Sequence, residues 1–441
     1  MKDPVKVGIA GCGGISRLYT GIYAGLADIA QVVAVADPVA GLAKARAKAL
    51  TEAYAAEAHK AQVLAANARS DKDRETQIIK SKAAFAASNV NIRVYPSHEE
   101  LLNDQEVQAL TLLTSPKIRA EPTIAAAESG RHVFTEGPLA ASVEEADAMV
   151  SAVRKAGIKF HAQVMDRYPR GMVLAKKAVE SGYLGKMGSA NVERNSYHPA
   201  SYWQFGGKVG LNTPGSSNHT MLRTWMGTWE GEGGGSVFHH GRYIIDPFLW
   251  VVGSRVVEVF AYAGPMLRDI ETDSLCQAVV KFSNGATGMI HTSLITHTTG
   301  LLRGARGRIL IIGDDAAMAI YNETGYDSIA TFTSENDQSP RLNIRSDTIF
   351  ASNDNPEALE ALESLRSEVQ GIPEKASHDY QTRKFMESII NDTDPLVPIE
   401  IPHHHVEVTR AIFKSAEEHQ PVTLPLNKND PFYSGKGRIT L

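Results

Sequence analysis

A strand, a glycine-rich turn and a helix near the N-terminus restrict the fold more than any other feature of the chain. Residues 5 to 10, VKVGIA, form an apolar run that leads directly into the turn GCGGIS. A helix-compatible stretch follows to about residue 30, and a second apolar run, VVAVAD, ends in Asp37. A strand, a turn, a helix and a strand that ends in an acid predict a βαβ unit, and therefore a parallel sheet.

The turn also carries the spacing of a dinucleotide-binding loop. Gly11, Gly13 and Ser16 match G-x-G-x-x-G/A with a serine in the third place. The first glycine permits a tight turn, and the second lets the backbone approach a pyrophosphate at the helix N-terminus. The small third residue allows the helix to pack closely on the strand. The loop residues expected around the cofactor are Gly11, Gly13, Gly14, Ile15 and Ser16.

Asp37 distinguishes between the two nicotinamide cofactors. It lies 26 residues beyond Gly11, at the end of the second predicted strand. There a carboxylate can bind both ribose hydroxyls of NAD and would repel the additional phosphate of NADP, and no Arg or Lys follows it directly. We therefore predict NAD rather than NADP. An aspartate that only caps the next helix would leave the glycine turn unexplained.

Strands and helices continue to alternate up to about residue 165. VQALTLLTSP, RHVFTEG and IKFHAQV have the pattern of strands, and EPTIAAAESG and SVEEADAMVSAVRKAG that of helices, which predicts a doubly wound parallel sheet over residues 1–165. Residues 41–90 interrupt this order with a proline-free stretch rich in Ala, Lys, Glu and Gln, which predicts one or two long helices. We interpret this insertion as a surface or subunit-contact elaboration rather than an active-site lid.

Beyond residue 165 the pattern changes to longer strands joined by turns. GSANVERNSY, VVEVFAYAG and GRILIIGDDAAMAIYN have the pattern of such strands, and Ser283-Asn284-Gly285 is typical of a turn. Residues 166–425 are expected to form an α+β domain with a large, mostly antiparallel open sheet, and residues 426–441 an extended tail. The predicted fold class is α/β, with a Rossmann domain followed by this second domain.

The composition narrows the range of partners. The chain has 441 residues, a formal net charge of −5 and only two cysteines, Cys12 and Cys276. These values give no basis for a nucleic-acid surface, a disulfide framework or a cysteine-rich zinc site. No apolar run reaches the roughly 18 to 20 residues of a membrane span, and no signal-peptide pattern precedes the first strand. We expect a cytoplasmic protein that acts on a small molecule.

The segment VFHHGRYIID, residues 237–246, concentrates residues that move protons. If residues 237–250 are helical, His239, Tyr243 and Asp246 are spaced i, i+4 and i+7 and share one face. Ser236 could cap that helix, whose positive end would favour a developing alkoxide. A histidine can serve as general base, and a tyrosine can relay a proton beside a cation. We therefore predict His239 or Tyr243 as the proton-handling group, Asp246 as a residue that orients a partner, and His240 as a further candidate.

Structural functions are the alternatives for these residues. Asp246 precedes Pro247 and could simply end a turn. Metal binding is disfavoured, because the adjacent His239 and His240 would point to different faces of a helix, so no metal site is predicted. The three histidines of PHHHVEV, residues 402–408, are interpreted as ordinary solvent-facing side chains rather than as metal ligands.

A polar and aromatic stretch, residues 193–229, precedes this segment. Its Trp and Tyr rings can stack on the C–H surfaces of a sugar, and its Asn, Arg and His side chains can bind hydroxyls. A glycine-rich loop that packs on its neighbours is the alternative. The predicted substrate-binding residues in this stretch are Arg194, Tyr197, His198, Trp203 and Asn218.

Together these motifs resemble the glucose–fructose oxidoreductase / inositol dehydrogenase / MocA family. The resemblance begins at VGIAGCGGIS, continues through AAAESGRHVFTEGPLAAS and GEGGGSVFHHGRYIID, and ends with VTRAIFKSAEEHQPVTLPL. It implies a nucleotide-binding domain followed by an α/β domain whose open sheet often forms subunit contacts, hence a homo-oligomer, either dimer or tetramer. It also implies oxidation or reduction of a carbinol on a sugar, polyol or cyclic diol. By position in these motifs, the further cofactor contacts would be Thr114, Pro116, Glu136, Gly137, Pro138 and Arg167, and Tyr168 would lie near the substrate.

The sequence departs from the family pattern in three places. Gly137 replaces the lysine of the usual Glu-Lys-Pro, which normally helps to bind the reacting hydroxyl. His239 and Tyr243, on either side of Gly241, stand at the polar places of the usual Asp-x-Gly-x-His. Arg119 stands where many members have a histidine.

Three functions are compatible with these departures. The first is an NAD-dependent oxidoreductase that acts on a sugar, polyol or sugar-like ring, with His198 or Tyr168 as alternative bases. The second is a redox-neutral glycoside-cleaving enzyme, similar to lysine-lacking relatives that oxidise a sugar carbon, eliminate the aglycone, add water and return the hydride. The third is a non-catalytic nucleotide-binding protein, and the polar, aromatic stretch argues against it.

Overall fold

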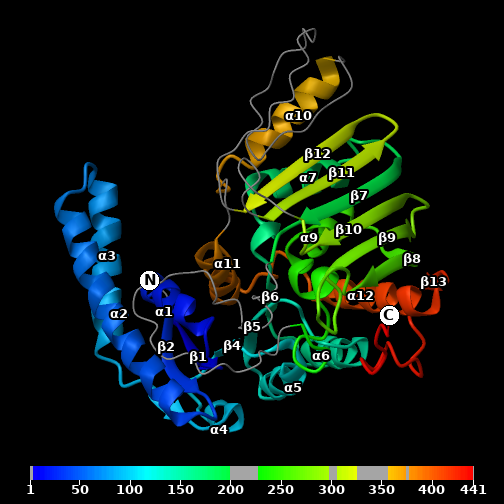
Figure 1. Ribbon diagram of the computed structural model, residues 1–441. Coiled ribbons are helices and arrows are strands. Elements are labelled where there is room, and N and C mark those ends of the chain that lie inside the picture. Colours follow the sequence, from blue (N-terminus) through cyan, green and yellow to red (C-terminus); the bar gives the residue numbers. More distant parts are fainter. Residues whose placement is uncertain (1–2, 199–226, 297–304, 325–355, 374–376, 441) are drawn as a thin grey trace. The chain divides into compact units, whose positions relative to one another are not determined.

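The computed structural model describes residues 3–198, 227–296, 305–324, 356–373 and 377–440. The chain divides into two units, each with its own sheet (Figure 1). The first unit contains Met1–Leu139, Ala146–Gln163 and Ser377–Glu400, and the second contains Ala140–Glu145, Val164–Ala376 and Ile401–Leu441. The sequence predicted a single boundary at residue 165. It did not predict that Ser377–Glu400 belong to the first unit.

The first unit is built on a six-stranded parallel sheet with the order β3-β2-β1-β4-β5-β6. The apolar run Val5–Ala10 forms β1, which pairs with β2 (Ala30–Ala36) and β4 (Ala109–Leu112). These strands are almost entirely buried, as expected where helices cover both faces of a parallel sheet. The remaining strands are β3 (Arg93–Tyr95), β5 (His132–Glu136) and β6 (Phe160–Gln163). This order is that of a Rossmann fold, which confirms the predicted doubly wound sheet.

Helices follow the strands of this unit as the sequence predicts. The prediction of long helices for residues 41–90 is confirmed by α2 (Ala40–Ala66) and α3 (Asp71–Ser88), which pack along each other (Figure 1). Ser70 caps α3 by accepting a hydrogen bond from the Asp73 amide at 3.1 Å. The other elements of this part are α1 (Ser16–Gly25), α4 (His98–Leu102), the 3-10 turn η1 (Pro116–Ile118), α5 (Ala120–Glu128), α6 (Val143–Ala156) and α11 (His378–Asn391).

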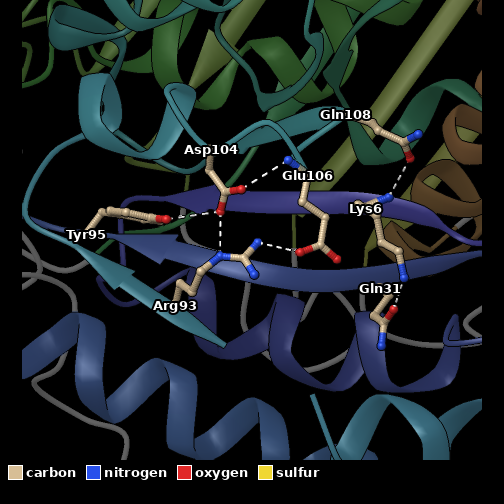
Figure 2. Close-up of polar contacts among 7 residues, drawn as sticks. All are labelled: Lys6, Gln31, Arg93, Tyr95, Asp104, Glu106 and Gln108. Atoms are coloured by element: carbon tan, nitrogen blue, oxygen red, sulfur yellow. Dashed lines mark hydrogen bonds and ion pairs between the residues drawn. The ribbon is translucent and has the colours of Figure 1, made fainter. Parts of the chain in front are cut away.

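Polar side chains fix the edge of the first sheet. Arg93 of β3 forms ion pairs with Asp104 at 2.6 Å and with Glu106 at 2.8 Å, and Tyr95 Oη donates to Asp104 at 3.1 Å (Figure 2). These contacts attach the short edge strand to the loop between α4 and β4. Figure 2 also shows the polar contacts that β1 makes, through Lys6, Gln31 and Gln108.

The second unit contains a seven-stranded sheet with the order β12-β11-β7-β10-β9-β8-β13. All neighbouring strands are antiparallel except β7 and β10, which are parallel, so the predicted mostly antiparallel sheet is confirmed. The turn at Ser283-Asn284-Gly285 joins β9 to β10, with Gly285 at φ +89°. The strands are β7 (Met187–Asn195), β8 (Val256–Gly264), β9 (Leu275–Phe282), β10 (Thr287–Ser293), β11 (Ala305–Gly313), β12 (Ala317–Thr324) and β13 (Val422–Thr423).

Helices cover one face of this second sheet and leave the other exposed. α7 (Arg170–Glu180) and α9 (Arg242–Val252) contact the strands β12, β11 and β7. In α12 (Glu400–Glu418), the Ser415 hydroxyl oxygen accepts a hydrogen bond from the Ala261 amide of β8. Along β9, Ala278 and Val280 are buried while Gln277 and Val279 are exposed, which is the alternation of a half-covered sheet. The remaining elements are η2 (Met165–Arg167), the turn η3 (Ser236–His240) and α10 (Pro356–Glu368).

The last residues of the chain pack against the second unit. Phe432 and Tyr433 are buried, and the Tyr433 carbonyl oxygen accepts a hydrogen bond from the Val143 amide at 3.1 Å. Turns at residues 428–435 replace the extended tail expected there. None of the helices in the described ranges combines the length and the apolar character needed to cross a bilayer.

Candidate active site

The glycine turn after β1 has the backbone shape that a dinucleotide requires. Gly11 adopts φ +93°, and a Cβ there would lie 2.8 Å from the Leu113 carbonyl oxygen, so only glycine fits. A Cβ on Gly13 or Gly14, by contrast, would meet no atom of the chain within 4 Å. Steric crowding within the chain therefore does not explain these two glycines, whereas close approach of a pyrophosphate does.

The helix that follows the turn presents uncapped backbone donors. α1 begins at Ser16, the N-cap residue Ile15 makes no side-chain hydrogen bond, and no acidic residue lies in the first turn. The Ser16 hydroxyl donates to the Gly13 carbonyl oxygen at 2.6 Å, and Ser16 is fully buried. Uncapped N–H groups at the positive end of a helix form a site for an anion.

Asp37 is held by the two segments that it joins. Its Oδ2 accepts a hydrogen bond from the Cys12 amide and its Oδ1 one from the Val39 amide, each at 2.8 Å. Asp37 therefore holds Val39, the residue before α2, and also anchors the glycine turn. Each carboxylate oxygen keeps lone-pair capacity for a ribose hydroxyl, because an ionised carboxylate offers about four acceptor positions.

Two polar groups near the turn have no hydrogen-bond partner among the described residues. The Thr114 hydroxyl, just after β4, is one of them. The other is the buried Nε of Arg46 in α2, whose Nη1 donates to Thr20 Oγ1 at 2.6 Å. Buried polar groups are normally satisfied, so both groups fit the presence of a polar ligand such as NAD. Thr114 was a predicted cofactor contact, whereas Arg46 was missed because it lies within the helical insertion.

A carboxylate with two aromatic partners lies where β5 ends. Tyr19 Oη donates to Glu136 Oε1 at 2.5 Å, and the His378 imidazole lies 3.7 Å from the same oxygen. The rings of Tyr19 and His378 meet edge to face. Glu136 was a predicted cofactor contact, but its partners were missed because they come from α1 and α11, far away in the sequence.

In the second unit, the segment VFHHGRYIID is helical but does not form a single α-helix. Ser236–His240 form a π-helical turn, in which the His240 amide donates to the Gly235 carbonyl oxygen at 3.3 Å, and α9 begins at Arg242. The wider π turn changes the angular spacing of its residues, so the shared face predicted for His239 with Tyr243 and Asp246 does not follow. The side chain of His239 lies outside the described structure.

Asp273, and not Ser236, caps this π turn. Its carboxylate accepts hydrogen bonds from the Gly235 amide at 2.7 Å, the Val237 amide at 2.8 Å and the Ser236 hydroxyl at 2.5 Å. Burial raises the pKa of Asp273, and these hydrogen bonds act in the opposite direction. Because Asp273 accepts from the amides at the start of this turn, the prediction that Ser236 caps the helix is wrong.

Tyr243 lies next to two guanidinium groups. The Cζ atoms of Arg242 and Arg194 lie 4.3 Å and 5.0 Å from its ring centroid, and Arg242 Nη2 donates to Tyr243 Oη at 2.6 Å. Arginine can only donate, so the phenolic proton is left to point toward another acceptor. Within the described part of the chain, no residue accepts that proton.

Asp246 forms a two-point ion pair with Arg167. Arg167 Nη2 donates to Oδ2 at 2.7 Å, Nε donates to Oδ1, and both side chains are buried. Pro247 lies inside α9, so the alternative in which Asp246 ends a turn is wrong. The neighbouring Tyr168 is also buried, with its ring against Trp250, which argues against Tyr168 as the base.

Two histidine rings meet beside these arginines. The ring centroids of His198 and His240 lie 4.5 Å apart. Burial, together with the charges of Arg194 and Arg268, lowers the pKa of His198 to about 4, so its imidazole is neutral near pH 7. Tyr197 is partly exposed, and Arg268 lies over its ring at 5.7 Å. Two further predicted substrate residues, Trp203 and Asn218, lie outside the described residues.

Two of the three histidines in residues 402–408 are buried, so their interpretation as solvent-facing is wrong. His404 Nε2 accepts a hydrogen bond from the Val256 amide at 2.9 Å. The His405 ring stacks on Phe238 and hydrogen-bonds the Val237 backbone, in the π turn. Both side chains are buried because α12 packs on β8 and on the π turn, a contact that the local sequence does not reveal.

Two family models match the chain. The oxidoreductase family, NAD-binding Rossmann fold, matches residues 56–164, and the oxidoreductase family, C-terminal alpha/beta domain, matches residues 176–424. The second match alone spans more than half of the chain. The chain belongs to the Gfo/Idh/MocA oxidoreductase family. Both the resemblance inferred from the motifs and the NAD-binding function of the Rossmann domain are confirmed.

Relatives of this Gfo/Idh/MocA protein act on sugars and polyols. The myo-inositol 2-dehydrogenase of Thermotoga maritima is 27% identical over 203 residues, which cover 46% of this chain and 54% of that protein. The 2,7-anhydro-N-acetylneuraminate hydratase of Escherichia coli is 32% identical over 101 residues, 23% of this chain and 27% of that protein. The matches thus span about half or less of these relatives' length.

Solved structures extend the similarity of fold to the whole chain. The WlbA dehydrogenase of Bordetella pertussis, crystallised with NADH and UDP-GlcNAcA, is 21% identical, with a TM-score of 0.66. The match covers 96% of this chain and all of that one.

Arg119 holds the segment of this family member that lacks the usual lysine. The buried guanidinium donates from Nη1 to the carbonyl oxygens of Glu136, at 2.5 Å, and Pro138, and from Nη2 to that of Thr114, at 2.5 Å. Arg119 is therefore bound to backbone on both sides of Gly137. Gly137 has no side chain and so contributes no proton-transfer group.

Proposed function

We propose that the protein is an NAD-dependent oxidoreductase that transfers a hydride between the nicotinamide and a carbinol carbon of a sugar, polyol or sugar-like ring. The observation that carries this proposal is the hydrogen bond from Arg242 to Tyr243 Oη, which leaves the phenolic proton for a substrate oxygen. Proton exchange with that oxygen must accompany hydride transfer, and a positioned side chain accelerates it. NAD, when bound, supplies the hydride acceptor or donor.

The first unit supplies the groups that would hold NAD. The diphosphate would lie over Gly13 at the N-terminus of α1, and Asp37 would bind the hydroxyls of the adenosine ribose. The negative charge of Asp37 favours NAD over NADP, whose additional phosphate would lie against it. Thr114 and Glu136, at the ends of β4 and β5, are further candidate contacts.

The paired rings of His198 and His240 provide a second acceptor for a substrate hydroxyl. His198 is neutral near pH 7, so one of its ring nitrogens can accept a hydrogen bond. His240 lies against it. His239 and His198 are the alternatives to Tyr243 as the proton-handling group.

A redox-neutral cleavage of glycosides is the second candidate, and Gly137 is the observation that favours it. Without the lysine, the reaction that the family usually carries out lacks its usual hydroxyl-binding group. The similarity to a 2,7-anhydro-N-acetylneuraminate hydratase also supports a reaction without net redox change. In this mechanism the hydride returns to the sugar, so reduced nicotinamide would not accumulate.

The exposed face of the second sheet supports a homo-oligomer. Val279 and Met289 are cross-strand neighbours on that face, 54% and 57% exposed, and Phe260 of β8 lies opposite Val279. Tyr262 is exposed on the same side. A row of apolar side chains across neighbouring strands is typical of a protein–protein interface, here with a second copy of the chain.

A substrate panel distinguishes these functions. The purified protein is incubated with NAD and with sugars, polyols and aryl glycosides, while reduced-nicotinamide absorbance and aglycone release are followed together. Accumulation of NADH with free sugars or polyols is the result expected for the proposed oxidoreductase. Aglycone release without NADH would instead establish the redox-neutral cleavage, and neither signal with any compound would contradict both.

A further inference from the structure

Positive charge accumulates around Tyr243 in the second unit. The guanidinium carbons of Arg242 and Arg194 lie 4.3 Å and 5.0 Å from its ring centroid. A third arginine, Arg268, donates from Nη2 to the His198 carbonyl oxygen at 3.2 Å. The charges of Arg194 and Arg268 both act on the His198 imidazole. Three guanidinium groups thus surround two of the candidate site residues.

The acids of this region give Arg194 only a weak partner. Asp246 forms its two-point ion pair with Arg167. Asp166 meets Arg194 through one contact of 3.4 Å, which is long for a buried ion pair. Burial raises the pKa of Glu232 to about 8, so this carboxyl group is mostly protonated at neutral pH. Arg194 therefore has one long ion pair, to Asp166.

Arg194 itself carries a donor that the protein leaves unused. Its position in β7 lies on the face that helices cover, and the residue is only 7% exposed. Its Nε is buried and has no hydrogen-bond partner in the described structure. Buried donors are normally satisfied, so this Nε is available to an acceptor from a bound molecule.

The sequence supplies no acid from the neighbouring segment. Residues 199–226, which join His198 to Gly227, contain Lys208 and Arg223 but neither Asp nor Glu. The chain directly after His198 therefore contains no carboxylate side chain before Gly227.

We infer that the substrate is an anionic sugar, whose carboxylate or phosphate group binds Arg194 and the arginines beside it. The inference rests on the proposed function and specifies the substrate class of that site. A guanidinium fork donates parallel hydrogen bonds to an oxyanion, which would satisfy the Nε of Arg194. An oxyanion bound there would bring the sugar ring next to the Tyr243 hydroxyl.

Calorimetric titration of the NADH-loaded protein tests this inference. Matched pairs are compared: D-glucuronate with D-glucose, D-galacturonate with D-galactose, and glucose 6-phosphate with glucose. At least one anion is expected to bind about tenfold or more tightly than its neutral parent, with an affinity that falls as salt is added. The uronate and phosphate pairs separate a carboxylate site from a phosphate site. Equal affinities within every pair would overturn the inference.

Variants show whether Arg194 is responsible. Arg194→Gln should weaken binding of the anion at least about tenfold more than binding of the neutral sugar, and Arg194→Lys should retain part of the preference. Arg308→Gln is the matched control, because Arg308 pairs with Glu193 on the exposed face of the same sheet. If Arg194→Gln does not fold, Arg268→Gln makes the same test. A preference that survives both arginine changes would contradict the inference.

The outcome is distinguishable from failure of the proposed function. Preferential binding of an anion without hydride transfer to any compound would keep this inference and contradict the oxidoreductase. Turnover of neutral polyols with no preference for anions would support the oxidoreductase and contradict this inference.

Discussion

Among single residues, Asp37 connects the fold of the first unit to its cofactor. The carboxylate holds Cys12 of the glycine turn and Val39 at the start of α2, and its remaining lone pairs are available to a ribose. Asp37→Ala removes both the anchor and the acceptor. We expect the Kd for NADH, measured by fluorescence titration, to rise about tenfold or more.

Asp28 offers a matched control for this change. It also lies in the first unit, where it pairs with Arg383 at 3.1 Å, away from the glycine turn. Asp28→Ala is therefore expected to leave the NADH affinity unchanged. An unaltered Kd in Asp37→Ala would show that the cofactor is not bound where we place it.

His405 makes the stability of the second unit depend on pH. Burial lowers its pKa to about 4, below the value of 6.5 expected for the unfolded chain. Between pH 6.5 and 4 the unfolded state therefore binds a proton that the folded state does not, and stability falls as the pH falls through this range. His198 acts in the same direction, with a folded pKa of about 4.

The His405→Phe variant tests this dependence. Between pH 7 and pH 5 the wild type should lose about 2 kcal/mol more of its free energy of unfolding than the variant, as measured by urea denaturation at each pH. Parallel pH profiles for the two proteins would mean that His405 is not held neutral. Stacking of the ring on Phe238 makes phenylalanine a suitable replacement.

Sequence reasoning at the residue level was accurate where neighbours along the chain determine the environment. Gly11 and Asp37 lie in a motif whose geometry follows from its own few residues. The function of Tyr243 stays a prediction; its cationic partner Arg194 comes from β7, and the partner of Asp246 is Arg167 of η2. Such contacts are set by tertiary packing, which the local pattern does not contain.

At the level of elements, the π turn before α9 depends on a carboxylate from another part of the chain. Asp273 accepts hydrogen bonds from the amides of Gly235 and Val237, and a Cβ at position 235 would lie 1.9 Å from the Asp273 carbonyl oxygen. The glycines of GEGGGS thus allow the backbone to approach this acid closely. The sequence predicted a helix here, but neither its π form nor its distant cap.

Asp273→Ala should destabilise the second unit, because it leaves two buried amides and the Ser236 hydroxyl without an acceptor. We expect a loss of about 3 kcal/mol, seen as a lower melting temperature. Asp273→Asn should have a smaller effect, because its amide oxygen still accepts. Asp269→Ala, at an exposed position shortly before it, is the control. Equal melting temperatures for the two alanine variants would contradict the capping function.

For the whole molecule, the exposed face of the second sheet predicts association through apolar contacts. Val279→Lys, alone or with Met289→Lys, should convert the oligomer to a monomer in light-scattering measurements, because a buried ammonium cannot be paired at an apolar interface. NADH binding to the first unit should be unchanged. Leu396→Lys replaces a residue that is also 54% exposed but lies in the first unit, and it should leave the assembly intact. A monomeric wild type would contradict this part of the proposal.

The overall architecture could largely be predicted from the sequence. The spacing of apolar residues indicates the strands and helices of both units, and the glycines mark the turns between them. The helical insertion was also predicted, since Ala-rich, proline-free sequence favours helix without help from tertiary contacts. The return of Ser377–Glu400 to the first unit could not be predicted, because α11 is defined by the core that it enters, through Phe385 and Met386.

A single-turnover experiment tests the central claim most directly. NAD-loaded protein is mixed with each compound that it turns over, and the absorbance of bound reduced nicotinamide is followed in the wild type, Tyr243→Phe and the control Tyr262→Phe. We expect reduced nicotinamide to form in the wild type and in Tyr262→Phe, and to form at least about 100-fold more slowly in Tyr243→Phe with unchanged NAD affinity. Turnover with no reduced nicotinamide at any time would contradict hydride transfer, and equal rates in all three proteins would exclude Tyr243 as the proton-handling group.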